Sequence, residues 1–133
     1  MILVDSNVLL DVVTNDPDWY DWSVRQLAAA ALQYDIAINP VVYAEISIRY
    51  ERIEEVDAML VEARAKLIEV PRKALFRAGK AHREYRSRGG IRTGVLPDFF
   101  IGAHAAVMDW PLLTRDARRY RTYFPTLDLI APE

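Results

Sequence analysis

Residues 1–13 read MILVDSNVLLDVV, and this stretch decides the fold class. The apolar run 2–4 is typical of a buried β-strand, and the apolar run that begins at Val8 is typical of a helix. Asp5 stands at the junction. A buried strand that ends in an acid and turns at once into a helix indicates a βαβ unit with a polar group placed for chemistry.

Short β-rich runs alternate with helical patterns along the rest of the chain. The expected strands are residues 2–4, 36–38, 67–70, 112–114 and 127–130. This alternation predicts an α/β fold with a mainly parallel, five-stranded sheet flanked by helices. No internal repeat or low-complexity linker interrupts the pattern, so the 133 residues are expected to form one domain.

Capping residues and apolar stripes predict the helices. Asp16 and Pro17 supply an N-cap and a first-turn proline, and Asn39 and Pro40 repeat this signal after the second strand. The segments 51–67 and 72–88 are expected to be amphipathic helices. Their apolar stripes are Ile53, Val56, Leu60 and Ala63 in the first, and Leu75, Ala78, His82 and Tyr85 in the second.

The composition excludes several kinds of site. The chain has no Cys, which excludes disulfides, thiolate metal sites and a Cys nucleophile, and is compatible with a reducing compartment. No basic segment precedes the first apolar run, and no apolar stretch approaches the ~20 residues that span a bilayer, so a soluble, cytoplasmic protein is expected. His82 and His104 lie on apolar patterns without ligand spacing, which predicts packing roles.

The charge is distributed unevenly. Residues 1–71 hold 13 Asp and Glu against 5 Lys and Arg, a net charge of −8, whereas residues 72–133 hold 6 against 12, a net charge of +6. Most basic residues are Arg, whose guanidinium matches phosphate oxygens, so the second half favours a polyanionic partner. Arg86, Arg88 and Arg92 are the candidate RNA-binding residues, with an ordinary solvated loop as the open alternative.

Four acids are expected near the same edge of the sheet. Asp5 follows the first strand and Asp116 follows the fourth. Glu45 lies in the second turn of the helix after the second strand, and Asp98 lies in the first turn of an apolar helix. Each has a structural alternative, such as an N-cap, a favourable interaction with a helix dipole or, for Glu45, an ion pair with Arg49.

Four clustered carboxylates need a counter-charge. Two carboxylates ~4 Å apart already repel by about 4 kcal/mol at an effective dielectric near 20. A hard divalent cation neutralises such a cluster, and oxygen ligands without Cys favour Mg²⁺ or Mn²⁺ over Zn²⁺. Such an ion activates a water for attack on a phosphodiester and stabilises the leaving oxygen. The acids and the basic second half therefore indicate a nuclease.

Four motifs, VDSNVLLD (4–11), NPVVYAEI (39–46), LPDFFIGAHA (96–105) and LLTRDARRYRTYFP (112–125), resemble those of PIN-domain ribonucleases, of the small toxin type often called VapC. The resemblance covers essentially the whole chain. It implies a PIN-like three-layer sandwich that forms a single domain over residues 1–133. It also implies metal-dependent RNA cleavage that inhibits translation, and a homodimer neutralised by a cognate antitoxin protein.

The resemblance also implies site residues. The acidic catalytic quartet, which binds Mg²⁺ or Mn²⁺, is Asp5, Glu45, Asp98 and Asp116, with Asp5 and Asp98 as the firmest ligands.

Two further positions, Thr114 and Ser6, match supporting residues of the family. A second acid sometimes follows the last motif, and here Arg118 and Arg119 stand in its place. This departure argues against a second metal held tightly without RNA.

A non-catalytic PIN-like RNA- or protein-binding module is the alternative function. In that case the acids would hold a metal, or Arg and Lys side chains of a partner, without cleaving anything. Loss of RNA cleavage in a folded Asp98→Asn variant separates the two functions.

Overall fold

The computed structural model describes residues 1–91 and 95–132 and contains a parallel five-stranded sheet. The strands are β1 (Ile2–Val4), β2 (Ile36–Ile38), β3 (Ala65–Leu67), β4 (Leu112–Leu113) and β5 (Leu129–Ile130), in the spatial order β3-β2-β1-β4-β5. Strands β1, β2 and β4 are buried throughout, as interior strands of a parallel sheet are. The predicted α/β fold is confirmed.

The strand order reverses at β1, which lies between β2 and β4. Ligands of open parallel sheets bind where the order reverses, beyond the carboxyl ends of the strands. Val4 pairs with Leu113, and the Asp5 N–H donates to the Leu113 carbonyl at 2.9 Å. Asp5 and Thr114, the residues that follow these two strands, therefore lie side by side at this edge.

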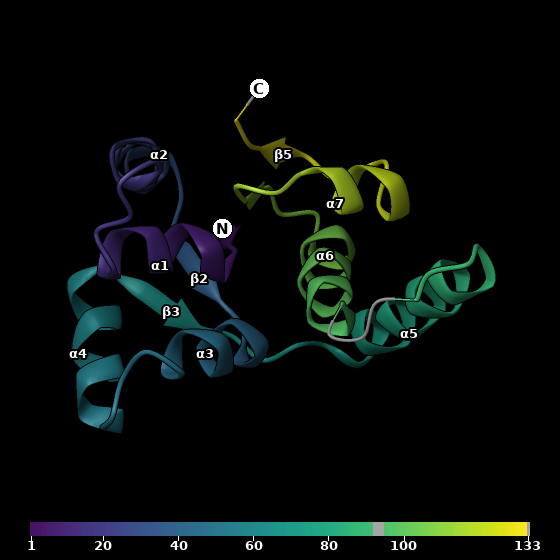
Figure 1. Ribbon diagram of the computed structural model, residues 1–133, viewed down its shortest axis with the longest axis horizontal. Coiled ribbons are helices and arrows are strands. Elements are labelled where there is room, and N and C mark those ends of the chain that lie inside the picture. Colours follow the sequence, from purple (N-terminus) through teal and green to yellow (C-terminus); the bar gives the residue numbers. More distant parts are fainter. Residues whose placement is uncertain (92–94, 133) are drawn as a thin grey trace.

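Helices flank the sheet (Figure 1). They are α1 (Ser6–Val13), α2 (Tyr20–Gln33), α3 (Pro40–Ser47), α4 (Ile53–Glu62), α5 (Arg72–Ser87), α6 (Leu96–Met108) and α7 (Arg118–Tyr123). Helix α1 packs against α2 and α3, and α6 packs against α3, α5 and α7. Helix α6 therefore connects the acidic first half of the chain to the basic second half.

Two predicted helix starts are confirmed. Helix α1 begins directly after Asp5, whose backbone is extended. Asn39 caps α3, since its Oδ1 accepts the Val42 N–H at 3.0 Å, and Pro40 occupies the first helical position.

Asp16 makes the predicted capping hydrogen bonds, but the regular helix begins later than predicted. Its carboxylate accepts the N–H groups of Asp18 and Trp19, each at 2.9 Å, and its carbonyl accepts the Tyr20 N–H at 3.1 Å. Helix α2 begins only at Tyr20.

The predicted third strand, 67–70, is displaced in the structure. Helix α4 ends at Glu62, and Arg64 adopts a left-handed backbone with φ 57°, which starts β3 at Ala65. The predicted helix 51–67 is therefore wrong over its last residues. Because β3 is an edge strand with Lys66 and Leu67 exposed, it carries no buried apolar run to mark it.

Other boundaries differ from prediction, and so do both apolar stripes, since Ile53 on α4 is 63 % exposed. The stripe expected on α5 is partly wrong, since Ala74, Ala78 and Ala81 are buried whereas Leu75 is 45 % exposed. Strand β4 ends one residue earlier than predicted, and β5 starts two residues later. None of the helices in the described part of the chain combines the length and apolar character needed to cross a membrane.

Candidate active site

Asp5 is nearly buried, with 4 % of its surface exposed. The hydroxyls of Thr114 and Tyr120 both donate to its Oδ2, each at 2.8 Å. Its Oδ1 has a longer contact, 3.5 Å from Ser6 Oγ, and so accepts weaker hydrogen bonding than Oδ2. The pKa of Asp5 is raised, because the effect of burial exceeds the opposing effect of these hydrogen bonds. The carboxylate is thus oriented by hydroxyl groups, and it forms no ion pair with the residues that the structure describes.

Glu45 lies within electrostatic range of Asp5. Ser6 Oγ donates to Glu45 Oε1 at 3.0 Å, so one serine bridges the two acids. Burial raises the pKa of Glu45, the Ser6 hydrogen bond lowers it, and the charges of Asp5 and Asp98 raise it further. The alternative ion pair with Arg49 is not formed among the residues that the structure describes.

Asp98 lies in the first turn of α6. Its pKa is raised to about 6, first by burial and next by the charge on Asp5. An ion pair with Arg119 lowers this pKa but does not cancel the rise. Asp5, Glu45 and Asp98 therefore share one region and resist simultaneous ionisation.

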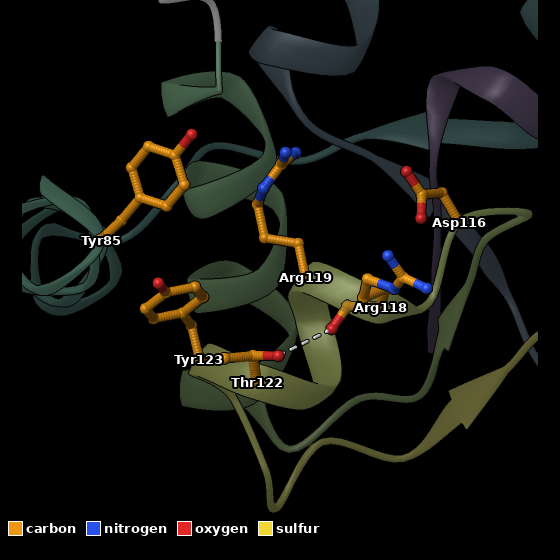
Figure 2. Close-up of a pocket in the computed structure, with 6 residues that line it drawn as sticks. All are labelled: Tyr85, Asp116, Arg118, Arg119, Thr122 and Tyr123. Atoms are coloured by element: carbon orange, nitrogen blue, oxygen red, sulfur yellow. Dashed lines mark hydrogen bonds between the residues drawn. The ribbon is translucent and has the colours of Figure 1, made fainter. Parts of the chain in front are cut away.

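Asp116 lies at the rim of this region. Its side chain is exposed, and its N–H donates to Thr114 Oγ1 at 3.1 Å. Its charge raises the pKa of Asp98 only as a minor cause. Asp116 and Arg119 line one pocket (Figure 2). The structure thus gathers three of the four predicted acids and puts the fourth at their edge.

The acids are not arranged as a ready metal cage. Within residues 1–91 and 95–132, no group of three or more His, Asp or Glu side chains is placed to hold a metal ion. Instead, the guanidinium of Arg119 contacts Asp98 and supplies positive charge. The departure from the family pattern noted at Arg119 thus has a structural consequence.

Tyr120 is a site residue that the sequence analysis missed. It is 2 % exposed, and its hydroxyl reaches Asp5 from α7. The end of α7 packs closely against α6 at Gly102, where an added Cβ would lie only 2.6 Å from the Phe124 ring. From the sequence, an aromatic residue four positions after Asp116 indicates packing. Only the hydroxyl group of Tyr120 could have indicated a second role.

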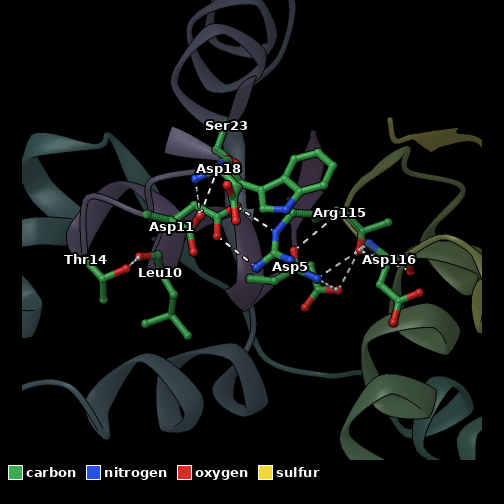
Figure 3. A network of polar contacts seen from close by, with 12 residues as sticks. Asp5, Leu10, Asp11, Thr14, Asp18, Ser23, Arg115 and Asp116 are labelled. Carbon is green, nitrogen blue, oxygen red and sulfur yellow. Dashed lines mark hydrogen bonds and ion pairs between the residues drawn. The ribbon is translucent and has the colours of Figure 1, made fainter. Parts of the chain in front are cut away.

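A partly buried ion pair anchors the loop that carries Thr114 and Asp116. Arg115 donates through Nε and Nη2 to the two carboxylate oxygens of Asp11, each at 2.9 Å (Figure 3). The Arg115 N–H also donates to Asn7 Oδ1 at 3.1 Å. Since Asp11 lies on α1, these contacts fix the loop relative to β1 and Asp5.

A sequence model of the PIN domain matches residues 2–125, which include all four acids. The chain belongs to the PIN-domain family. PIN domains are generally nucleases that use divalent metal ions. The acids at the end of β1 and on α3 and α6 therefore lie in a domain whose usual chemistry suits them.

Solved structures share the fold over nearly their full length. A VapBC2 complex from Rickettsia felis, bound to promoter DNA, contains a chain that is 24% identical with a TM-score of 0.74, and each chain is covered to 100%. A toxin–antitoxin complex from Klebsiella pneumoniae gives 19% identity and a TM-score of 0.73, with 100% of this chain and 98% of that chain covered. No curated protein sequence gives a significant match. The predicted PIN-like three-layer sandwich is confirmed.

The RNA-binding role of the arginines in this PIN domain stays a prediction. Arg86 is exposed in the last turn of α5. Arg88 forms an ion pair with Glu84 at 2.8 Å and lies over the Tyr123 ring. Arg92 lies outside the described residues.

The packing roles predicted for the histidines agree with the structure. His104 is fully buried beside Trp110, and burial lowers its pKa. His82 lies against the rings of Tyr85 and Phe99, with centroids 6.3 and 5.8 Å away.

Proposed function

We propose that this PIN domain is a metal-dependent endoribonuclease that hydrolyses RNA phosphodiester bonds. One observation carries the proposal: burial raises the pKa values of Asp5, Glu45 and Asp98, and the charge on Asp5 raises those of Glu45 and Asp98 further. Carboxylates maintained in such a cluster stabilise a cation that is bound between them. A fold that needed only packing at this position would be more stable without the charges.

The donor set fits Mg²⁺ or Mn²⁺. Asp5 and Asp98 would be the main ligands, and Glu45 and Asp116 would complete the site directly or through water. When bound, a hard divalent ion lowers the pKa of a water and stabilises the leaving oxygen. Arg119 contacts Asp98, so this guanidinium would compete with a bound metal for the carboxylate.

The protein's own groups orient the acids. Thr114 and Tyr120 hold Asp5 through Oδ2, and Ser6 holds Glu45 through Oε1. Oxygen Oδ1 of Asp5 remains for a ligand. The arginines of the second half would hold the phosphates that flank the cleaved bond.

Arg119→Gln is expected to tighten Mn²⁺ binding about tenfold, because a cation that competes for Asp98 is removed. Calorimetric titration of the metal-free protein measures this without RNA. Arg121→Gln is the matched control, since Arg121 lies on the same helix and is exposed. Equal affinity in wild type and Arg119→Gln would show that the guanidinium does not compete with the metal.

The proposed function predicts discrete cuts in RNA that require metal. Purified protein, free of any partner, is incubated with total cellular RNA in Mg²⁺, in Mn²⁺ or in EDTA, and the new RNA ends are sequenced. Cuts at defined positions with Mg²⁺ or Mn²⁺, and none with EDTA, are the expected result. They would also identify the substrate.

Intact RNA in every condition, from folded protein that binds metal, would favour the non-catalytic binding module. If the protein retained RNA without producing new ends, it would be an RNA-binding module. If it retained no RNA, a protein-binding module would be favoured.

We infer a toxin role from the solved relatives, which are toxin–antitoxin complexes. An apolar groove of about 790 Å³ between α1, α2 and α4 offers a surface for an antitoxin segment, with Glu55 and Glu62 among its lining residues. A matching segment would present apolar residues with basic ones beside them. Growth arrest on expression, with the same RNA cuts appearing in the cells, would support this role. The homodimer and the cytoplasmic location stay predictions.

A further inference from the structure

A pocket of about 430 Å³ adjoins the acids. Figure 2 shows two tyrosines on one side of it, Asp116 on the other and two arginines between them. The lining residues come from α5, α7 and the loop before α7: Tyr85, Asp116, Arg118, Arg119, Thr122 and Tyr123. Aromatic rings, cations and one acid of the predicted quartet thus face one space.

The tyrosine side of the pocket is held by aromatic neighbours. The centroids of Tyr85 and Tyr123 lie 6.1 Å apart, and the fully buried Phe99 contacts Tyr123 edge-on at 5.2 Å. Rings held in place before a ligand arrives lose little conformational entropy when a planar group stacks on them. A nucleobase is such a group, and its stacking on an aromatic ring is tolerant of sequence.

The arginines add a phosphate-binding element. Arg118 is exposed and pairs with no carboxylate in the part of the chain that the structure describes. Arg119 lies with Cζ 5.9 Å from the Tyr85 ring centre, and its Nη1 contacts Asp98. Guanidinium groups match phosphate oxygens in geometry and charge. One side chain therefore links the aromatic side of the pocket to the acids.

We propose, on the basis of the ribonuclease function proposed above, that this pocket binds one unpaired nucleotide of the RNA next to the cleaved bond. The base stacks on Tyr123 in place of the Arg88 guanidinium, which lies 5.7 Å from the centre of that ring, and a flanking phosphate contacts Arg118. A base within a duplex is already stacked and paired, so the RNA must be single-stranded at this position.

Two substitutions at one residue test the stacking. Tyr123→Leu removes the ring but keeps an apolar side chain, and Tyr123→Phe keeps the ring. We expect Tyr123→Leu to raise the KM for a short single-stranded oligoribonucleotide about tenfold with little change in kcat, and Tyr123→Phe to behave as wild type. A hairpin that pairs the same nucleotides should be cut poorly by all three proteins.

The control variants separate stacking from folding. Tyr20→Leu changes another partly exposed tyrosine, on α2, and should leave KM unchanged. Arg118→Gln replaces an exposed side chain without disturbing packing and should raise KM about threefold, with a weaker salt dependence than wild type.

Binding without cleavage distinguishes this proposal from the ribonuclease function. Fluorescent oligouridylate is titrated in EDTA, and anisotropy is measured. Binding about tenfold weaker in Tyr123→Leu than in wild type supports the pocket, whether or not RNA is cut. Absence of cleavage with metal would overturn only the nuclease function. Equal KM and equal binding in wild type and Tyr123→Leu, or equal losses in the Leu and Phe variants, would overturn the stacking pocket while cleavage stands.

Discussion

Asp98→Asn is expected to lower metal-dependent RNA cleavage about 10³-fold while making the metal-free protein more stable. The loss corresponds to about 4 kcal/mol of transition-state stabilisation, a reasonable share for one anionic metal ligand. An amide keeps the shape of the carboxylate but carries no charge. The folded protein therefore remains intact while its affinity for the cation falls.

The gain in stability follows from the raised pKa of Asp98. The carboxyl group ionises near 3.8 in the unfolded chain and at about 6 in the folded protein. Because the folded state holds the proton more tightly, the free energy of unfolding falls as pH rises from about 4 to about 6, and it stays lower above pH 6. At pH 7.5 the neutral amide avoids this loss, which is about 1–2 kcal/mol for a side chain that is 31% exposed.

Thermal melting without metal measures this effect. The Asp98→Asn variant should melt roughly 5 °C above wild type at pH 7.5, and the two should melt together near pH 4. Asp128→Asn, an exposed change just before β5, should alter neither melting nor cleavage. A variant that melts below wild type at pH 7.5 would mean that the Arg119 ion pair outweighs burial and repulsion.

Local patterns predicted the parts of the fold that are buried on both faces. Strand β1 and the turn into α1 were predictable because a central parallel strand needs an unbroken apolar run. Strand β3 was misplaced because an edge strand tolerates exposed residues such as Lys66. The register of β1 and β4 then placed Asp5 beside Thr114, as a rule about strand ends predicts.

The contacts that tune the site depend on how helices pack, which no local pattern records. The ion pair between Arg119 and Asp98 and the hydrogen bond from Tyr120 to Asp5 both require α7 to lie against α6. That approach depends on Gly102, where a Cβ would collide with Phe124. The positions of the acids and the supporting hydroxyls of Thr114 and Ser6 were therefore predictable. The contacts from Arg119 and Tyr120 were not.

Asp11→Ala is expected to lower the free energy of unfolding by about 3 kcal/mol. Asp11 is 2% exposed and accepts hydrogen bonds from Arg115 and from the buried hydroxyl of Ser23, which lies 2.7 Å away. Removing it leaves a partly buried guanidinium and a buried hydroxyl without their acceptor, and such losses cost more than the pair itself contributes. The melting temperature should fall by roughly 10 °C.

Glu84→Ala is the matched control, because it breaks an ion pair of similar length that is exposed on α5. Water replaces that partner, so the loss should stay below about 0.5 kcal/mol. The Asp11–Arg115 pair also holds the loop that carries Thr114 and Asp116, so cleavage by Asp11→Ala should fall even at temperatures where the variant is fully folded. Full activity in the folded variant would mean that the hydrogen bond from the Arg115 N–H to Asn7 suffices to hold the loop.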